Sequence, residues 1–137
     1  MKILHIVSSI NPKNGGVIES IKLKNILYKE LKLHCEIACL DCFSKNLLID
    51  KRLPFVNFLG VSKNSISNYI NFNRWLIFNI RNYDLIICDG IWELTNYFLW
   101  KVAKKFNVKY SVVVHGMLDP WFNKDKLKDI KKLIYWW

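Results

Sequence analysis

The sequence has little glycine, and it lacks the glycine-rich motifs that most often mark a nucleotide site. There are five glycines in 137 residues. None forms G-x-G-x-x-G, so a dinucleotide site has little support, and the absence of G-x-x-x-x-G-K-[ST] excludes a P-loop. Long apolar runs are missing too, since no segment approaches the ~18 residues of a membrane span. The N-terminus has no signal-peptide core or cleavage site, so we expect a cytoplasmic protein.

Arginine is scarce although the chain is basic. The net charge of +10 is nearly all lysine, and the arginines are Arg52, Arg74 and Arg81. Base readout and bidentate phosphate contacts favour arginine, and no nucleic-acid-binding motif is present. We therefore expect no nucleic-acid partner. The scattered lysines are interpreted as solvated helix faces, with a weak attraction to anionic lipid as the alternative.

The four cysteines occur without a secretion signal, so reduced thiols are expected. Cys35, Cys39 and Cys42 have the C-x3-C-x2-C spacing of iron–sulfur sites in radical enzymes. Such ligands lie in a loop, whereas residues 35–40 have the pattern of a strand. We interpret these cysteines and Cys88 as small buried or half-buried thiols.

What the sequence does contain is an alternation of strand-like and helix-like segments over one domain's length. Apolar, β-branched runs predict strands at residues 2–8, 34–40, 55–59, 84–88 and 109–114. Apolar residues at helical spacing predict helices at about 17–32, 65–81 and 93–106, with a basic helix from residue 122. This alternation predicts an α/β, Rossmann-like three-layer sandwich with a mostly parallel sheet.

The same patterns predict which helix faces are buried. The first helix is expected to bury Val17, Ile21, Leu27, Tyr28 and Leu31, with Lys22, Lys24, Asn25, Lys29 and Lys32 facing water. The second is expected to bury Ile66, Tyr69, Ile70, Ile77 and Ile80. The third is apolar nearly all round and is expected to be largely buried. His5, inside the first strand, is interpreted as a core histidine with satisfied hydrogen bonds.

In a parallel sheet all strands end at the same edge, so the loops 9–16, 89–92 and 115–121 are predicted to be neighbours. Gly15 and Gly16 lead into a helix N-terminus, where free N–H groups and the helix dipole suit a phosphate. A plain turn is an equal alternative for these two glycines.

His115 is the candidate site residue at the last strand end. It follows three valines, 112–114, whose run predicts a strand covered on both faces, and it precedes a glycine. Asp89 also ends a strand before a glycine. Trp92 and Trp121 flank these loops. Either they form a pocket wall for a sugar ring, or they simply pack against neighbouring residues.

These features together resemble the N-terminal half of retaining GT-B glycosyltransferases of the family-4 type. The most specific part is H-G-M-L-D-P-W, residues 115–121. The paired glycines, Glu19 and the string D-L-I-I-C-D-G-I-W at 84–92 extend the resemblance over essentially the whole chain.

The resemblance implies an acceptor-binding domain that faces a second domain holding most of a nucleotide-sugar donor. Gly15 and Gly16 would approach the donor diphosphate, and His115 would act beside the transferred sugar. Asp89, Trp92 and Asp119 are the candidate acceptor or sugar contacts, although many relatives have histidine where Asp89 stands. The resemblance also implies sugar transfer with retention, without a metal or other cofactor, in which the donor phosphate helps the acceptor lose its proton.

No donor-binding C-terminal domain is present within residues 1–137. We therefore interpret the chain as one domain, cut within or after its last helix and inactive alone. The expected partners are a nucleotide sugar, a glycan or lipid-linked acceptor, and the missing domain or a partner chain. The alternative is a non-catalytic nucleotide- or sugar-binding module completed by another polypeptide.

The lysines of the last predicted helix add a possible peripheral contact with the inner face of the cell membrane. We prefer to interpret this last predicted helix as an internal crossover helix. The lysines concerned are Lys124, Lys126, Lys128, Lys131 and Lys132.

Overall fold

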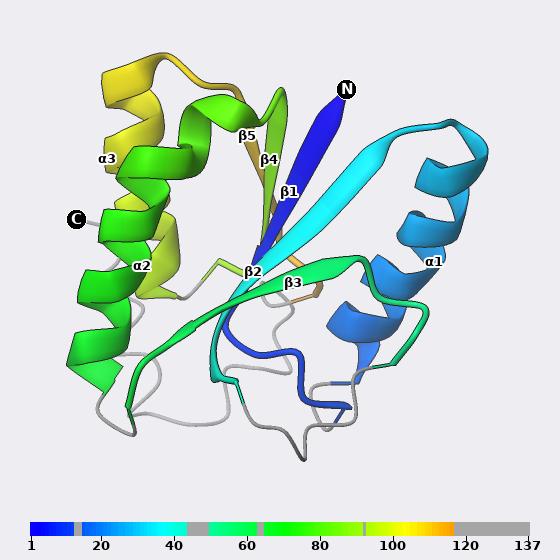
Figure 1. The fold of residues 1–137 in the computed structure, drawn as a ribbon, viewed down its shortest axis with the longest axis horizontal. Coiled ribbons are helices and arrows are strands. Elements are labelled where there is room, and N and C mark those ends of the chain that lie inside the picture. The colour runs from blue at the N-terminus through cyan, green and yellow to red at the C-terminus, as the bar shows by residue number, and fades with distance from the viewer. Residues whose placement is uncertain (13–14, 44–49, 63–64, 92, 117–137) are drawn as a thin grey trace.

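The computed structural model describes residues 1–12, 15–43, 50–62, 65–91 and 93–116, in which strands and helices alternate along the chain (Figure 1). The elements are β1 Lys2–Val7, α1 Gly16–Glu30, β2 His34–Cys42, β3 Phe55–Gly60, α2 Ser65–Asn79, the 3-10 helix η2 Ile80–Asn82, β4 Leu85–Asp89, α3 Leu94–Phe106 and β5 Tyr110–Val113. The predicted elements are therefore confirmed with small shifts at their ends. The predicted basic helix from residue 122 lies outside the described residues.

The strands form one five-stranded sheet in the order β3-β2-β1-β4-β5. Every neighbouring pair is parallel. Figure 1 shows α1 on one side of this sheet and α2 and α3 together on the other. The predicted three-layer α/β sandwich with a parallel sheet is confirmed.

Two apolar clusters hold the layers together, one on each face of the sheet. Leu4 and Ile6 of β1 pack with Phe72 of α2 and Leu99 of α3 on one face. On the other face Ile21 of α1 belongs to the second cluster, whose further members include Val7, Ile18 and Ile37. Strand side chains alternate between the faces, so β1 contributes to both clusters.

The prediction for the buried face of α1 is wrong in part. Leu27 is 57% exposed, whereas Lys22 and Asn25 are buried. Lys22 Nζ lies 2.9 Å from Asp50 Oδ2, and Asn25 Nδ2 donates to the Arg52 carbonyl at 2.8 Å. A polar loop, rather than apolar side chains, therefore packs against this part of the helix, and helical periodicity alone cannot reveal it.

Leu31, also predicted to be buried, is exposed just after α1 ends.

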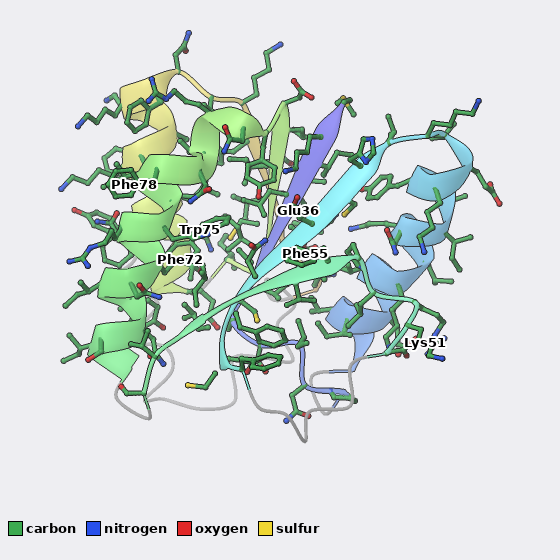
Figure 2. All side chains as sticks on the ribbon, viewed as in Figure 1. Glu36, Lys51, Phe55, Phe72, Trp75 and Phe78 are labelled. Carbon is green, nitrogen blue, oxygen red and sulfur yellow. The ribbon has the colours of Figure 1, made fainter. Side chains whose placement is uncertain are left out.

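The predictions for α2 and α3 are also wrong in part. In α2 the fully buried side chains are Phe72 and Leu76, while Ile66 and Ile70 are exposed. Figure 2 shows Trp75 on the side of α2 toward the sheet and Phe78 on the outer side. The third helix is covered on one side only, because Thr95, Leu99, Val102 and Ala103 face inward while Leu94, Tyr97 and Trp100 are exposed.

β5 is an edge strand in the described sheet, and it is less covered than its valines predict. Residues 112–114 are only partly buried, and Tyr110 and Ser111 are exposed. A fully apolar run predicts that helices cover both faces, but at the edge of the described sheet this cover is incomplete. None of the described helices has the length and apolar character needed to cross a membrane.

Candidate functional site

Three strand ends lie at one edge of the sheet, as predicted from the sequence. β1 pairs with β4, and β4 with β5, all in parallel, so their C-terminal ends point the same way. One backbone hydrogen bond ties the end of β4 to β5, and another ties the end of β1 to β2. The Gly90 amide donates to the Val113 carbonyl at 2.9 Å, and the Leu40 amide donates to the Ser8 carbonyl at 3.0 Å.

A buried carboxylate lies between two histidines at this edge. Asp89 ends β4, and its side chain has no exposed surface. Its Oδ2 lies 2.5 Å from His5 Nδ1, and its Oδ1 lies 2.7 Å from His115 Nε2. His115 keeps 15% of its side chain exposed, so it is the member of this group that a ligand can reach. We call His5, Asp89 and His115 the His–Asp–His group.

His5 joins this group from inside β1. It is fully buried, and its Nε2 lies 3.4 Å from the Tyr28 hydroxyl of α1. The interpretation of His5 as a satisfied core histidine is confirmed. Its link to the candidate site was missed, although the register supplies the signal: His5 pairs with Ile87, two residues before Asp89, so both side chains share one face of the sheet.

Asp89 is held in its ionised form. Burial by itself raises the pKa of this carboxyl, but hydrogen bonds from His5 and His115, helped by Lys24 with its Nζ 3.7 Å away, lower the pKa overall. An ionised carboxylate only accepts hydrogen bonds. His5 Nδ1 and His115 Nε2 must then both carry hydrogen, and the lone pair of a neutral His115 ring lies on Nδ1.

The backbone at His115 has an unusual conformation. His115 has φ 45° and Gly116 has φ 73°, so two consecutive residues occupy the left-handed region. For a residue with a Cβ this costs roughly 1–2 kcal/mol. The hydrogen bond to Asp89 helps to offset that cost. Strain of this kind, at a strand end that faces a loop cluster, is typical of functional sites.

The paired glycines form an open turn before α1. Gly15 is the N-cap of the helix, with φ 52°, which favours glycine. No described atom lies within 4 Å of an ideal Cβ built on Gly15 or Gly16. The first-turn N–H groups of a helix have no intrahelical acceptor, and Gly15 has no side chain to cap them. The turn therefore has room and donors for an anion, and the loop before it is fixed by the Ile10 amide, which donates to Asp41 Oδ2 at 2.7 Å.

Two of the predicted acceptor or sugar contacts, Trp92 and Asp119, lie outside the described residues, as does Trp121. Asp89 is described, but both of its oxygens are used by the histidines. The structure thus brings Asp89 and His115 into direct contact and places the loop of Gly15 and Gly16 after the C-terminal end of a strand in the same sheet.

The cysteines do not form a cluster site in the described residues. Cys35 and Cys39 belong to β2, as the predicted strand at residues 34–40 required, and β2 extends beyond that prediction to include Cys42. Burial raises the pKa of Cys35, Cys39 and Cys88 to about 12, so these groups are thiols rather than metal-binding thiolates near neutral pH. Across the described ranges, no group of three histidine, cysteine or acidic side chains is placed to hold a metal ion.

No protein-family model matches the sequence, and the curated proteins give no match. Several solved structures are similar in fold. A putative UDP-N-acetylglucosamine 2-epimerase from Listeria monocytogenes has a TM-score of 0.58 at 12% identity over 98% of this chain. The UDP-GlcNAc 2-epimerase from Methanocaldococcus jannaschii has a TM-score of 0.52 at 18% identity, also over 98%. The C-terminal domain of a hydrogenase from Pyrococcus furiosus has a TM-score of 0.55 at 14% identity over 82%.

The chain spans 36% of each epimerase and 91% of the hydrogenase domain. At these identities the likeness shows the fold, which is Rossmann-like and GT-B-like. Because this fold carries unrelated functions, as the hydrogenase domain illustrates, function must be argued from the site.

Proposed function

We propose that this chain is the acceptor-side half of a retaining GT-B glycosyltransferase of the family-4 type. It would contribute to the transfer of a sugar from a nucleotide-sugar donor to a glycan or lipid-linked acceptor. The observation that carries the proposal is the partly exposed His115, held by a buried, ionised Asp89 at the sheet edge. An imidazole fixed in this way suits hydrogen bonding to a sugar or the stabilisation of developing charge.

The roles follow from the hydrogen bonding. Asp89 orients the His115 ring by accepting the hydrogen bond from its Nε2. His115 would contact the transferred sugar. The Gly15 N–H already donates to the Pro12 carbonyl at 3.0 Å, so the first-turn N–H groups of α1, beyond this turn, would face the donor diphosphate. In the reaction the bond between the sugar C1 and the phosphate oxygen breaks, the acceptor oxygen bonds to C1, and the acceptor proton passes to the departing phosphate.

The second wall of the site would come from a donor-binding domain. Residues 1–137 would be one domain of the larger enzyme and inactive alone, and the reaction as proposed uses no metal. We propose that the enzyme works in the cytoplasm on a nucleotide-sugar substrate. Trp92 and Asp119 remain proposed acceptor contacts.

The test uses the complete protein, including any domain encoded downstream. Nucleoside diphosphate release is measured with a panel of nucleotide sugars, with and without acceptor glycans, and the anomeric configuration of the product is read by NMR. His115→Ala is expected to lower kcat by about 10²–10³-fold, the usual loss for one charge-stabilising group. His34→Ala is the matched control, because His34 is exposed at the opposite end of β2.

Unchanged turnover in His115→Ala would remove this residue from the site. An inverted product would exclude the retaining mechanism. Acceptor-independent conversion of UDP-GlcNAc to an epimer would favour an epimerase, the activity named for two of the similar structures. Binding of a nucleotide sugar without any turnover would favour the non-catalytic module.

A further inference from the structure

The outer side of α2, η2 and α3 carries large apolar and aromatic side chains that face solvent. Phe78 is 75% exposed, Tyr97 49% and Trp100 47%. Figure 2 shows Phe78 pointing away from the sheet. We call this surface the α2–α3 outer face. Its exposed apolar residues are Ile66, Ile70, Phe78, Leu94, Tyr97 and Trp100.

Every charged side chain of α2, η2 and α3 is positive. The described ranges 65–82 and 94–106 contain no aspartate or glutamate. Their cations are Arg74, Arg81, Lys101, Lys104 and Lys105, all of them exposed. By contrast α1, which also exposes leucines, carries Glu19 and Glu30 among them.

Cations and aromatic rings are interleaved on α3. Its inner side is taken by Leu99 and its neighbours, so Tyr97, Trp100 and Lys104 are left on the outer side. The Tyr97 and Trp100 ring centroids lie 6.0 Å apart, and Lys104 Nζ lies 5.7 Å from the Trp100 ring centroid. Tyrosine and tryptophan have an apolar body and a polar tip, and lysine has an apolar stem, so this combination suits a boundary between water and hydrocarbon.

We propose that the α2–α3 outer face docks the protein on an anionic lipid surface. Apolar side chains that enter the headgroup boundary supply binding energy, and surrounding lysines and arginines add attraction to anionic lipid. Association of this face with itself in a second copy would place like charges together, which is unfavourable. This proposal does not rest on the transferase assignment.

The placement of the face relates it to the candidate site. α2 follows β3 and α3 follows β4, so both helices begin at the sheet edge where the strands end. Ile66, Ile70, Leu94 and Tyr97 lie in the first halves of these helices, near that edge. Docking through this face would bring the edge that carries His115 toward the membrane surface.

The test is co-sedimentation of the full chain with phosphatidylglycerol–phosphatidylcholine vesicles and with pure phosphatidylcholine vesicles. Binding is expected for the anionic vesicles at low salt, with weak binding to the neutral ones. Lys101→Gln, Lys104→Gln and Lys105→Gln combined should lower the affinity at least tenfold, since each lysine contributes about fivefold near an anionic surface. Ile70→Ser with Tyr97→Ser should also weaken binding, through lost insertion.

The matched control combines Lys29→Gln, Lys32→Gln and Lys51→Gln, which changes the net charge equally at exposed lysines away from α2 and α3. This variant should bind nearly as tightly as the unmodified chain. Circular dichroism shows whether each variant is folded.

Equal losses of vesicle affinity in the two triple variants would show that binding depends on net charge alone, and would overturn the proposal. If vesicle binding is lost only when Lys126, Lys128 and Lys131 are replaced, the contact belongs to the C-terminal segment and the proposal is overturned. Failure of the full chain to sediment with anionic vesicles, or dimer formation that Ile70→Ser with Tyr97→Ser abolishes, would also overturn it.

Discussion

At the scale of single residues, the central feature is a charge that is buried but fully bonded. Asp89 would be costly in this position without partners, because desolvation opposes its ionised form. His5 and His115 each supply one hydrogen bond, and Lys24 lies nearby. The carboxylate can therefore be buried and ionised together, which fixes the orientation of His115.

This arrangement predicts a specific pH dependence of stability. The pKa of Asp89 is lower in the folded chain than in the unfolded one. Its contribution is therefore fully present above the ordinary carboxyl pKa of about 4 and is lost as the pH falls through the lower, folded value. Asp89→Asn should reduce the free energy of unfolding at pH 7 by about 1–3 kcal/mol. The gap between the two proteins should narrow below about pH 4.

Urea denaturation at a series of pH values measures this gap. His5→Leu is the companion variant, because the His5 hydrogen bond is the largest effect that lowers the pKa of Asp89. When both proteins carry His5→Leu, the difference in unfolding free energy caused by Asp89→Asn should depend less on pH. A gap that stays constant from pH 7 to pH 3 would contradict the assignment of an ionised Asp89.

At the scale of elements, the junction of β2 and β3 shows how one residue permits a pairing. The register between these strands shifts between Cys39 and Cys42, where Gly60 comes opposite Cys42. A Cβ on Gly60 would collide with the Leu40 carbonyl oxygen and lie 2.6 Å from the Asp41 carbonyl carbon. Backbone atoms cannot yield as a flexible side chain can, so this position requires glycine.

Gly60→Ala is therefore expected to lower the free energy of unfolding by about 1–3 kcal/mol through overpacking. Gly16→Ala is the matched control: it lies at the start of α1, no described atom lies near its ideal Cβ, and its φ is not positive. That variant should be neutral or slightly stabilising, because alanine is the better helix former. Thermal unfolding compares the two, and equal Tm values would contradict the close approach at Gly60.

At the scale of the whole molecule, the four free cysteines report on how tightly the layers pack. Cys39 and Cys88 are buried, Cys35 is partly buried and Cys42 is exposed. In the folded chain one thiol should react rapidly with a thiol reagent at pH 8, and the other three slowly. At a pKa of about 12, only about one in 10⁴ of a thiol group is thiolate at that pH.

All four thiols should react rapidly in urea. Mass spectrometry after brief labelling should place the first modification on Cys42. Fast labelling of Cys88 in the native protein would show that the layer formed by α2 and α3 opens readily from the sheet, contrary to the packing described above.

The sequence by itself determined the order and kind of the elements. Strand-like and helix-like periods are local, so runs such as residues 84–88 and the spacing in 65–81 identify a strand and a helix without knowledge of the rest. Their alternation then leaves few topologies other than a parallel sheet. His115 stands out locally for the same reason, since it ends an apolar run.

Only the tertiary structure decided which faces are covered and which side chains meet. Lys22 is buried and Leu27 exposed because of the loop that lies opposite α1, and no property of the helix alone sets that. His5 and Asp89 are 84 positions apart and meet because β1 and β4 are neighbours in one register. Burial and hydrogen bonding depend on atoms distant in the sequence, whereas secondary structure depends mainly on atoms nearby.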